Sequence, residues 1–153
     1  IPHLINMLND NDVNVRSCLA AAFGFIADQR AIQPLIAMLE DDDEWVRIRS
    51  AKALGKFRDQ RVTQPLLNAV NDDSEWVRYN AIWSLGQVKD GTAFDHIIAS
   101  LNDKNANVRR GAAEALGKFN DPRAIQPLED KLSSEDDFSV RTSIDTALKK
   151  LNY

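Results

Sequence analysis

A valine–arginine dipeptide recurs along this chain at almost constant spacing. It stands at 15–16, 46–47, 77–78, 108–109 and 140–141, so successive copies are 31, 31, 31 and 32 residues apart. A glycine follows each of the first four valines by nine residues, at 24, 55, 86 and 117. A period of this length indicates an array of small units, each of which buries its apolar face by stacking on its neighbours. The chain is therefore expected to be a repeat protein.

Each unit contains two segments with helical periodicity. In the second unit Ile32, Leu35, Ile36 and Leu39 recur at i, i+3, i+4 and i+7, which places them on one face of a helix. An acidic turn follows, and the segment 44–57 then repeats the helical pattern. The residue three before each recurrent valine is expected to cap this second helix: Asp12, Asp43, Ser74, Asn105 and Asp137. The recurrent glycines lie inside the second-helix pattern, so we interpret them as points of close packing.

The pattern predicts an all-α fold, an α-solenoid (superhelix) of five two-helix repeats in a single domain. The repeats are expected at about 1–27, 28–58, 59–89, 90–120 and 121–153. Their helices are expected at 1–9 with 13–26, 31–40 with 44–57, 62–71 with 75–88, 93–102 with 106–119, and 124–133 with 138–151. The chain opens at Ile1 without the Asp-x-Arg-Ala turn of later units, so we expect a truncated N-terminus. Polar Asp145, Thr146 and Lys149 in the last unit predict a native C-terminal cap.

The composition argues against several classes of protein. Its longest apolar run, 18–27, is too short to span a bilayer, so no membrane association is expected. A net charge of −4 argues against general coating of nucleic acid. Cys18 is the single cysteine, which favours a reducing, cytoplasmic location. We expect a monomer.

Two recurring segments connect the chain to a known family. They read Asp-x-Arg-Ala-Ile-Gln-Pro-Leu at 28–35 and 121–128, and Val-Arg-x-x-x-Ala-x-Ala-Leu-Gly-Lys-Phe at 46–57 and 108–119. The unit resembles the HEAT-like repeat of phycobilisome lyases, and the resemblance covers essentially the whole chain. It implies a solenoid whose second helices line the inner, concave face. Because this repeat serves in bilin lyases, in metal-dependent hydroxylases and in proteins that only bind other proteins, it leaves the function open.

One arginine occupies the same position in every unit, and an acidic residue precedes it by six positions. The arginines are Arg16, Arg47, Arg78, Arg109 and Arg141, and the acidic residues are Asp10, Asp41, Asp72, Asp103 and Glu135. An anion-binding row is one interpretation. We favour a structural one, in which each planar guanidinium pairs with the acidic turn of its own or the next repeat. The family resemblance implies the same Asp–Arg ladder.

No residue pattern indicates catalysis or a bound metal or cofactor. His3 and His96 fall where other units carry proline, and three repeats separate them, so they are expected to be surface residues of a first turn rather than metal ligands. The hydroxylases built on related repeats carry recurring His-Glu pairs, which are absent here. Cys18 has no histidine near it in its helix, which argues against a thiol nucleophile. The sequence therefore favours a protein without catalytic activity.

The units differ most along one stripe of the second helix, at offsets −1, +2, +3, +6 and +10 from the recurrent valine. All three tryptophans lie on this stripe, in two adjacent units. Trp83 replaces lysine or glutamate of other units, so we expect a solvent-facing binding residue, whereas Trp45 and Trp76 are equally consistent with covering a neighbouring turn. Aromatic clusters with a basic rim are typical of recognition surfaces. The predicted partner-binding residues are Trp45, Ile48, Arg49, Lys52, Trp76, Tyr79, Asn80 and Trp83.

Three functions remain open at this point. The first is a scaffold without catalytic activity that binds a protein partner through the patch on its concave face. The second, implied by the family resemblance alone, is a bilin lyase or isomerase-like subunit that holds a tetrapyrrole in the same groove beside Arg49 and Lys52. The third and least favoured is binding of single-stranded nucleic acid by stacking and by the basic residues Arg49, Lys52, Lys56, Arg110 and Lys118.

Overall fold

The computed structural model describes residues 2–151, and in this part of the chain every regular element is a helix. The longer second helices are α2 (Val13–Ile26), α4 (Glu44–Leu54), α6 (Glu75–Val88), α8 (Ala106–Phe119) and α10 (Phe138–Leu151). The first helices are α1 (Pro2–Asn6), α3 (Ile32–Ala37), α5 (Thr63–Ala69), α7 (Phe94–Ala99) and α9 (Ile125–Ser134). The predicted all-α solenoid is confirmed.

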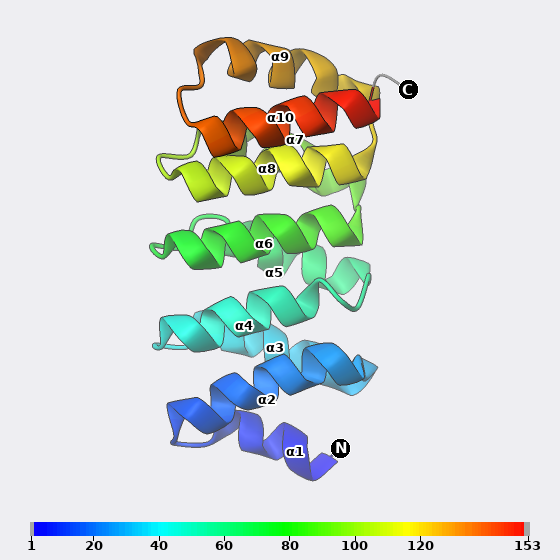
Figure 1. The fold of residues 1–153 in the computed structure, drawn as a ribbon. Helices are drawn as coiled ribbons and strands as arrows, with labels where there is room; N and C mark the ends of the chain where they lie inside the picture. Colours follow the sequence, from blue (N-terminus) through cyan, green and yellow to red (C-terminus); the bar gives the residue numbers. More distant parts are fainter. Residues whose placement is uncertain (1, 152–153) are drawn as a thin grey trace.

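The pairs stack in chain order, with each second helix packed against the second helix of the next pair (Figure 1). This arrangement forms a continuous layer of α2, α4, α6, α8 and α10, which we call the second-helix face. The first helices α3, α5 and α7 lie behind it (Figure 1). The apolar core runs through the stack, and its largest fully buried side chains include Phe23, Leu54, Ile82 and Leu116.

Several helices are shorter than the sequence predicted. Turns of 3₁₀ helix flank the first helices, at Met7–Asn9, Gln29–Ala31, Met38–Glu40, Gln60–Val62, Gly91–Ala93, Ser100–Asn102 and Pro122–Ala124. The α-helix α4 also ends at Leu54 rather than at 57, because the amides of Lys56 and Phe57 bond three residues back, to Ala53 and Leu54. Such i→i−3 bonds tighten the chain at a helix end and let it turn within a few residues.

Side-chain caps fix the start of the second helices. Four of the five expected caps accept backbone N–H groups: Asp12, Asp43, Asn105 and Asp137. The expectation is wrong for Ser74, which stands before α6 but whose buried hydroxyl has no hydrogen-bond partner among the described residues. The Asp72 carboxylate instead accepts the Ser74 backbone N–H at 2.8 Å.

The recurrent glycines allow adjacent second helices to approach closely, as predicted. A methyl group on Gly86 would lie 2.8 Å from the Ala115 Cβ, and one on Gly24 would lie 3.0 Å from Ala53. At Gly55 the obstacle is Ser84, whose Oγ would be 2.5 Å away. Real Cβ atoms do not make such short contacts, so any larger residue here would push two repeats apart.

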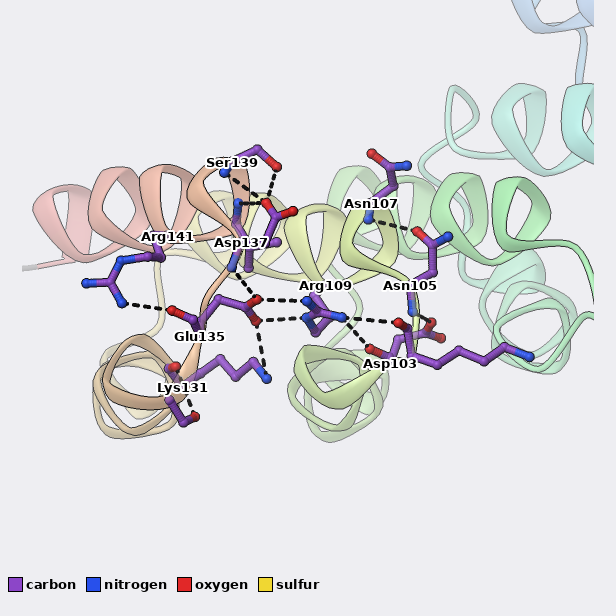
Figure 2. Close-up of polar contacts among 12 residues, drawn as sticks. Asp103, Asn105, Asn107, Arg109, Lys131, Glu135, Asp137, Ser139 and Arg141 are labelled. Carbon is purple, nitrogen blue, oxygen red and sulfur yellow. Dashed lines mark hydrogen bonds and ion pairs between the residues drawn. The ribbon is translucent and has the colours of Figure 1, made fainter.

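The arginine row forms a ladder that links each repeat to the next. Arg16, Arg47 and Arg78 each donate two hydrogen bonds to the aspartate 25 positions later, and Arg109 donates two to Glu135. Each guanidinium also donates to carbonyls of its own turn, and Figure 2 shows this arrangement around Arg109. Hydrogen bonds from Arg109 lower the pKa of Glu135 to about 2, although burial opposes the shift. The structural interpretation of these arginines is confirmed.

The last arginine of the row is different. Arg141 is exposed and donates only to the carbonyls of Leu132 and Glu135, at 2.9 and 2.8 Å (Figure 2). No carboxylate lies within ion-pair distance of it among residues 2–151.

Four residues at the ends of second helices have left-handed backbone conformations. They are Ala27, Arg58, Lys89 and Asn120, with φ between 49° and 58°. The amides of Ala27, Lys89 and Asn120 each bond back to a carbonyl four residues earlier, which ends the helix and starts the turn to the next repeat.

Candidate functional site

A groove of about 540 Å³ lies across α2, α4 and α6 on the second-helix face. We call it the aromatic groove. Its apolar lining comes from Phe25 on α2, Trp45 and Ile48 on α4, and Trp76 and Tyr79 on α6. Its polar lining comes from Arg49, Lys52, Lys56 and Asn80. Seven of the eight residues predicted to bind a partner therefore lie in one site.

The aromatic side chains of the groove remain open to solvent. Phe25 is 88% exposed, Trp45 59% and Trp76 45%, whereas Ile48 is only 7% exposed and belongs to the core. Large apolar side chains gain about 25 cal/mol for each Å² removed from water, so exposing three of them together on a folded surface is unfavourable. Exposed apolar clusters of this kind are typical of interaction sites. Trp45 and Trp76 therefore each present part of the indole to the groove instead of being fully covered by a neighbouring turn.

Tyr79 is held in place by three neighbours. Its ring meets Trp76 edge to face, with centroids 6.4 Å apart, and the Arg110 guanidinium lies 5.7 Å from its centroid. Gly111 provides the space, because a methyl group there would lie 2.8 Å from the Tyr79 Cδ2. This glycine lies outside the nine-residue glycine pattern, so its role follows only from the structure.

The polar rim carries positive charge. Arg49, Lys52 and Lys56 have no carboxylate within ion-pair distance among the described residues. The Asn80 side-chain amide donates to the Trp76 carbonyl at 2.8 Å, so it is already engaged within its own helix. The groove therefore presents cations that are available to a ligand beside an apolar floor.

Trp83 departs from the expectation of a solvent-facing residue at the centre of the patch. It is half-buried and does not line the groove. The Lys56 and Lys118 ammonium groups lie 5.3 and 4.7 Å from its ring centroid, Lys56 from the turn after α4 and Lys118 from α8. The long lysine side chains of the neighbouring repeats cover the indole, and cation–π attraction holds them there.

Phe25 is the aromatic groove residue that the predicted binding set omitted, and Lys56 is also missing from that set. Phe25 occupies offset +10 of the first unit, where other units carry Lys56, Gln87 and Lys118. This hydrophobic replacement at a polar position was the available signal. It was weak, because a single apolar residue on a protein surface is common.

The remaining candidate residues are scattered. His3 and His96 are exposed on α1 and α7, and Cys18 is exposed on α2. Residues 2–151 contain no group of three or more histidine, cysteine, aspartate and glutamate side chains arranged to hold a metal ion. Over the same residues, no helix is both long and apolar enough to cross a membrane.

The sequence itself matches a family model across both halves of the stack. The model describes HEAT repeats, and it matches residues 1–78 and 63–149. The chain belongs to the HEAT repeat family. No curated protein matches the chain.

Solved structures of repeat proteins are similar over nearly the whole chain. One is the complex of CpcE and CpcF of phycocyanin lyase from Nostoc sp., with 25% identity and a TM-score of 0.85 over 99% of this chain. Another is the YIBA protein of E. coli, with 27% identity and a TM-score of 0.73 over 99%. The chain spans 65% and 55% of the length of these two proteins. A designed armadillo repeat protein in complex with the peptide (KR)4 shares the fold, at 21% identity and a TM-score of 0.70, over 97% of this chain and 80% of its own length.

Proposed function

We propose that this HEAT repeat solenoid is a scaffold without catalytic activity, which binds a polypeptide partner in the aromatic groove. The observation that carries the proposal is the joint exposure of Phe25, Trp45 and Trp76 over a groove that spans three repeats. Aromatic anchors at the centre of an interface supply much of its binding free energy. The solved relatives include repeat proteins in complexes with a protein or a peptide, which is consistent with this use of the fold.

The proposal is tested by capturing ligands with matched variants. The immobilised chain and its Trp45→Ala/Trp76→Ala variant are exposed to a display library of random 12-residue peptides, and the dissociation constants of selected peptides are measured by fluorescence anisotropy. Loss of an aromatic anchor typically costs about 2 kcal/mol or more, so affinity should fall at least about thirtyfold. Phe138→Ala is the control, because Phe138 is 83% exposed on α10, outside the groove.

A clear result contradicts the proposal. If the selected peptides bind the double variant as tightly as the original chain, the groove is not the binding site. Thermal melts of the three proteins must coincide within a few degrees, and this is expected because Trp45 and Trp76 are 59% and 45% exposed and neither belongs to the buried core.

A second candidate function is a lyase-like subunit that holds a tetrapyrrole in the same groove. The similarity to the phycocyanin lyase complex favours it, as do the cations Arg49 and Lys52, which form no ion pair within residues 2–151 and match the carboxylates of a bilin. Bound bilin should show a shifted visible absorbance that Trp76→Ala abolishes. An unchanged spectrum at high bilin excess excludes this candidate.

A further inference from the structure

A line of lysines continues from the aromatic groove towards the C-terminal end of the stack. Lys56 lines the groove, and its ammonium group contacts the Trp83 ring. Lys118 contacts the same ring from α8 and lines a second pocket of about 290 Å³, which Lys150 of α10 also lines. We call Lys56, Lys118 and Lys150 the lysine row. The contacts make the groove, Trp83 and the second pocket one continuous surface.

These lysines have little negative charge around them. Among the described residues, the one ion pair made by a lysine is that of Lys131 with Glu135. Glu114 lines the second pocket together with Lys118 and Lys150, and its carboxylate lies 3.8 Å from the Arg110 guanidinium. Burial lowers the pKa of Lys118, and Lys150, Lys56 and Lys89 add to that effect while Glu114 opposes it. The row is thus a run of cations that repel one another and form no ion pair among the described residues, with Glu114 as a neighbouring carboxylate.

The groove and the lysine row differ in chemical character. Phe25, Trp45 and Trp76 give the groove an exposed apolar surface, whereas the row carries positive charge. A polypeptide can place an apolar side chain beside the tryptophans and confine its negative charges to the lysine end.

Building on the proposed function, we propose that the partner is an extended acidic peptide. A large apolar side chain of the peptide fills the aromatic groove, and its aspartate or glutamate residues lie along the lysine row. Three helix spacings of about 8–10 Å separate Lys56 from Lys150, and an extended chain covers this span with about 7–9 residues. Ser143, which lines the second pocket, supplies a hydroxyl group that can donate to a carboxylate.

The test analyses the composition of the peptides selected from the random library. We expect enriched sequences to combine an aromatic or large aliphatic residue with two or more acidic residues within the next nine positions. Lys118→Gln/Lys150→Gln should weaken the best peptide about fivefold, because exposed ion pairs contribute modestly and the loss is confined to two of them. Lys104→Gln is the control, since Lys104 is exposed in the turn before α8 and does not line either pocket.

The outcomes distinguish this inference from the proposed function. Selected peptides that are neutral or basic, yet lose binding in Trp45→Ala/Trp76→Ala, overturn the acidic partner and leave the scaffold function standing. Peptides insensitive to that tryptophan variant overturn both. Acidic peptides that bind Lys118→Gln/Lys150→Gln and Lys104→Gln equally well show that the lysine row is not their site and overturn the inference. Displacement of the best peptide by a single-stranded oligonucleotide at equal concentration overturns the assignment to a polypeptide. Circular dichroism melts of each variant verify folding.

Discussion

Replacing Arg78 by alanine should destabilise the middle of the stack more than an ordinary surface substitution. The Arg78 side chain is only 6% exposed and donates to both Asp103 carboxylate oxygens, at 2.9 and 3.0 Å. It also donates to the carbonyls of Asp72 and Asp73. Burial opposes ionisation of Asp103, but hydrogen bonds from Arg78 and from the Asn105 amide outweigh it and hold the pKa of that carboxyl below its ordinary value. The alanine variant therefore leaves a half-buried carboxylate without its cation.

The expected loss follows from these contacts. Removing one partner of a buried ion pair costs about 3–5 kcal/mol. Asp103 keeps the Asn105 amide bond at 2.8 Å and is 15% exposed, so we expect a smaller loss of about 2–3 kcal/mol. For a chain of this size, that corresponds to a decrease of about 4–12 °C in melting temperature.

The assay compares Arg78→Ala with Arg141→Ala by urea denaturation and by thermal melting at pH 7. Arg141 shares the sequence position but bonds only to carbonyls and is exposed, so its loss should be about 1 kcal/mol or less. Equal losses for the two variants would refute the reasoning, because they would show that the carboxylate contact between repeats contributes nothing. A double variant, Arg78→Ala/Asp103→Ala, should lose less than the sum of its single substitutions.

Three further predictions concern pH, backbone conformation and the groove. The pKa of Glu135 is about 2 in the folded chain against an ordinary 4.5, so its contribution of about 3 kcal/mol to stability is present above pH 4.5 and lost as pH falls towards 2. In Glu135→Gln the urea midpoint should therefore depend less on pH between pH 5 and 3, and an unchanged pH dependence contradicts this. Ala27→Gly should raise the free energy of unfolding, measured by urea denaturation, by about 0.5–1 kcal/mol, since glycine adopts the left-handed conformation freely. Asn120→Gly should gain less in the same assay, because asparagine already tolerates that conformation. Gly111→Ala should displace the Tyr79 ring and weaken binding of a selected peptide severalfold, and unchanged affinity with an unchanged melt would show that the ring position is unimportant.

The fold follows from the sequence where one residue has one dominant role. The valine–arginine period, the aspartate caps and the glycines each respond to a local constraint, and the structure places them as predicted at Asp43, Arg47 and Gly86. The 3₁₀ turns beside the first helices were missed because i→i−3 and i→i−4 bonds use the same residue types. The failed cap at Ser74 depends on where its hydroxyl rotates, which the sequence does not specify.

The groove was predictable to the extent that positions along a helix determine which side chains point to the same face. Offsets along a helix place Trp45 and Trp76 on the same face as Ile48, and the structure brings them together. Trp83 was misjudged because a stripe does not describe the side chains that reach across from adjacent repeats. Lys56 reaches the indole from the turn after α4, and only the three-dimensional arrangement shows this contact.

The arginine ladder has a consequence for how such a chain can lengthen. Every ion pair of the ladder joins a guanidinium in one unit to a carboxylate in the following unit. Each inner unit therefore supplies an arginine to the next unit and a carboxylate to the previous one. A tandem duplication of any 31-residue segment within the stack would therefore create a new junction whose two halves already match. Growth by duplication of whole units needs no compensating mutation at the ladder, whereas insertion of half a unit would separate an arginine from its carboxylate. The ion pair that links neighbouring units thus also allows the number of units to change during evolution.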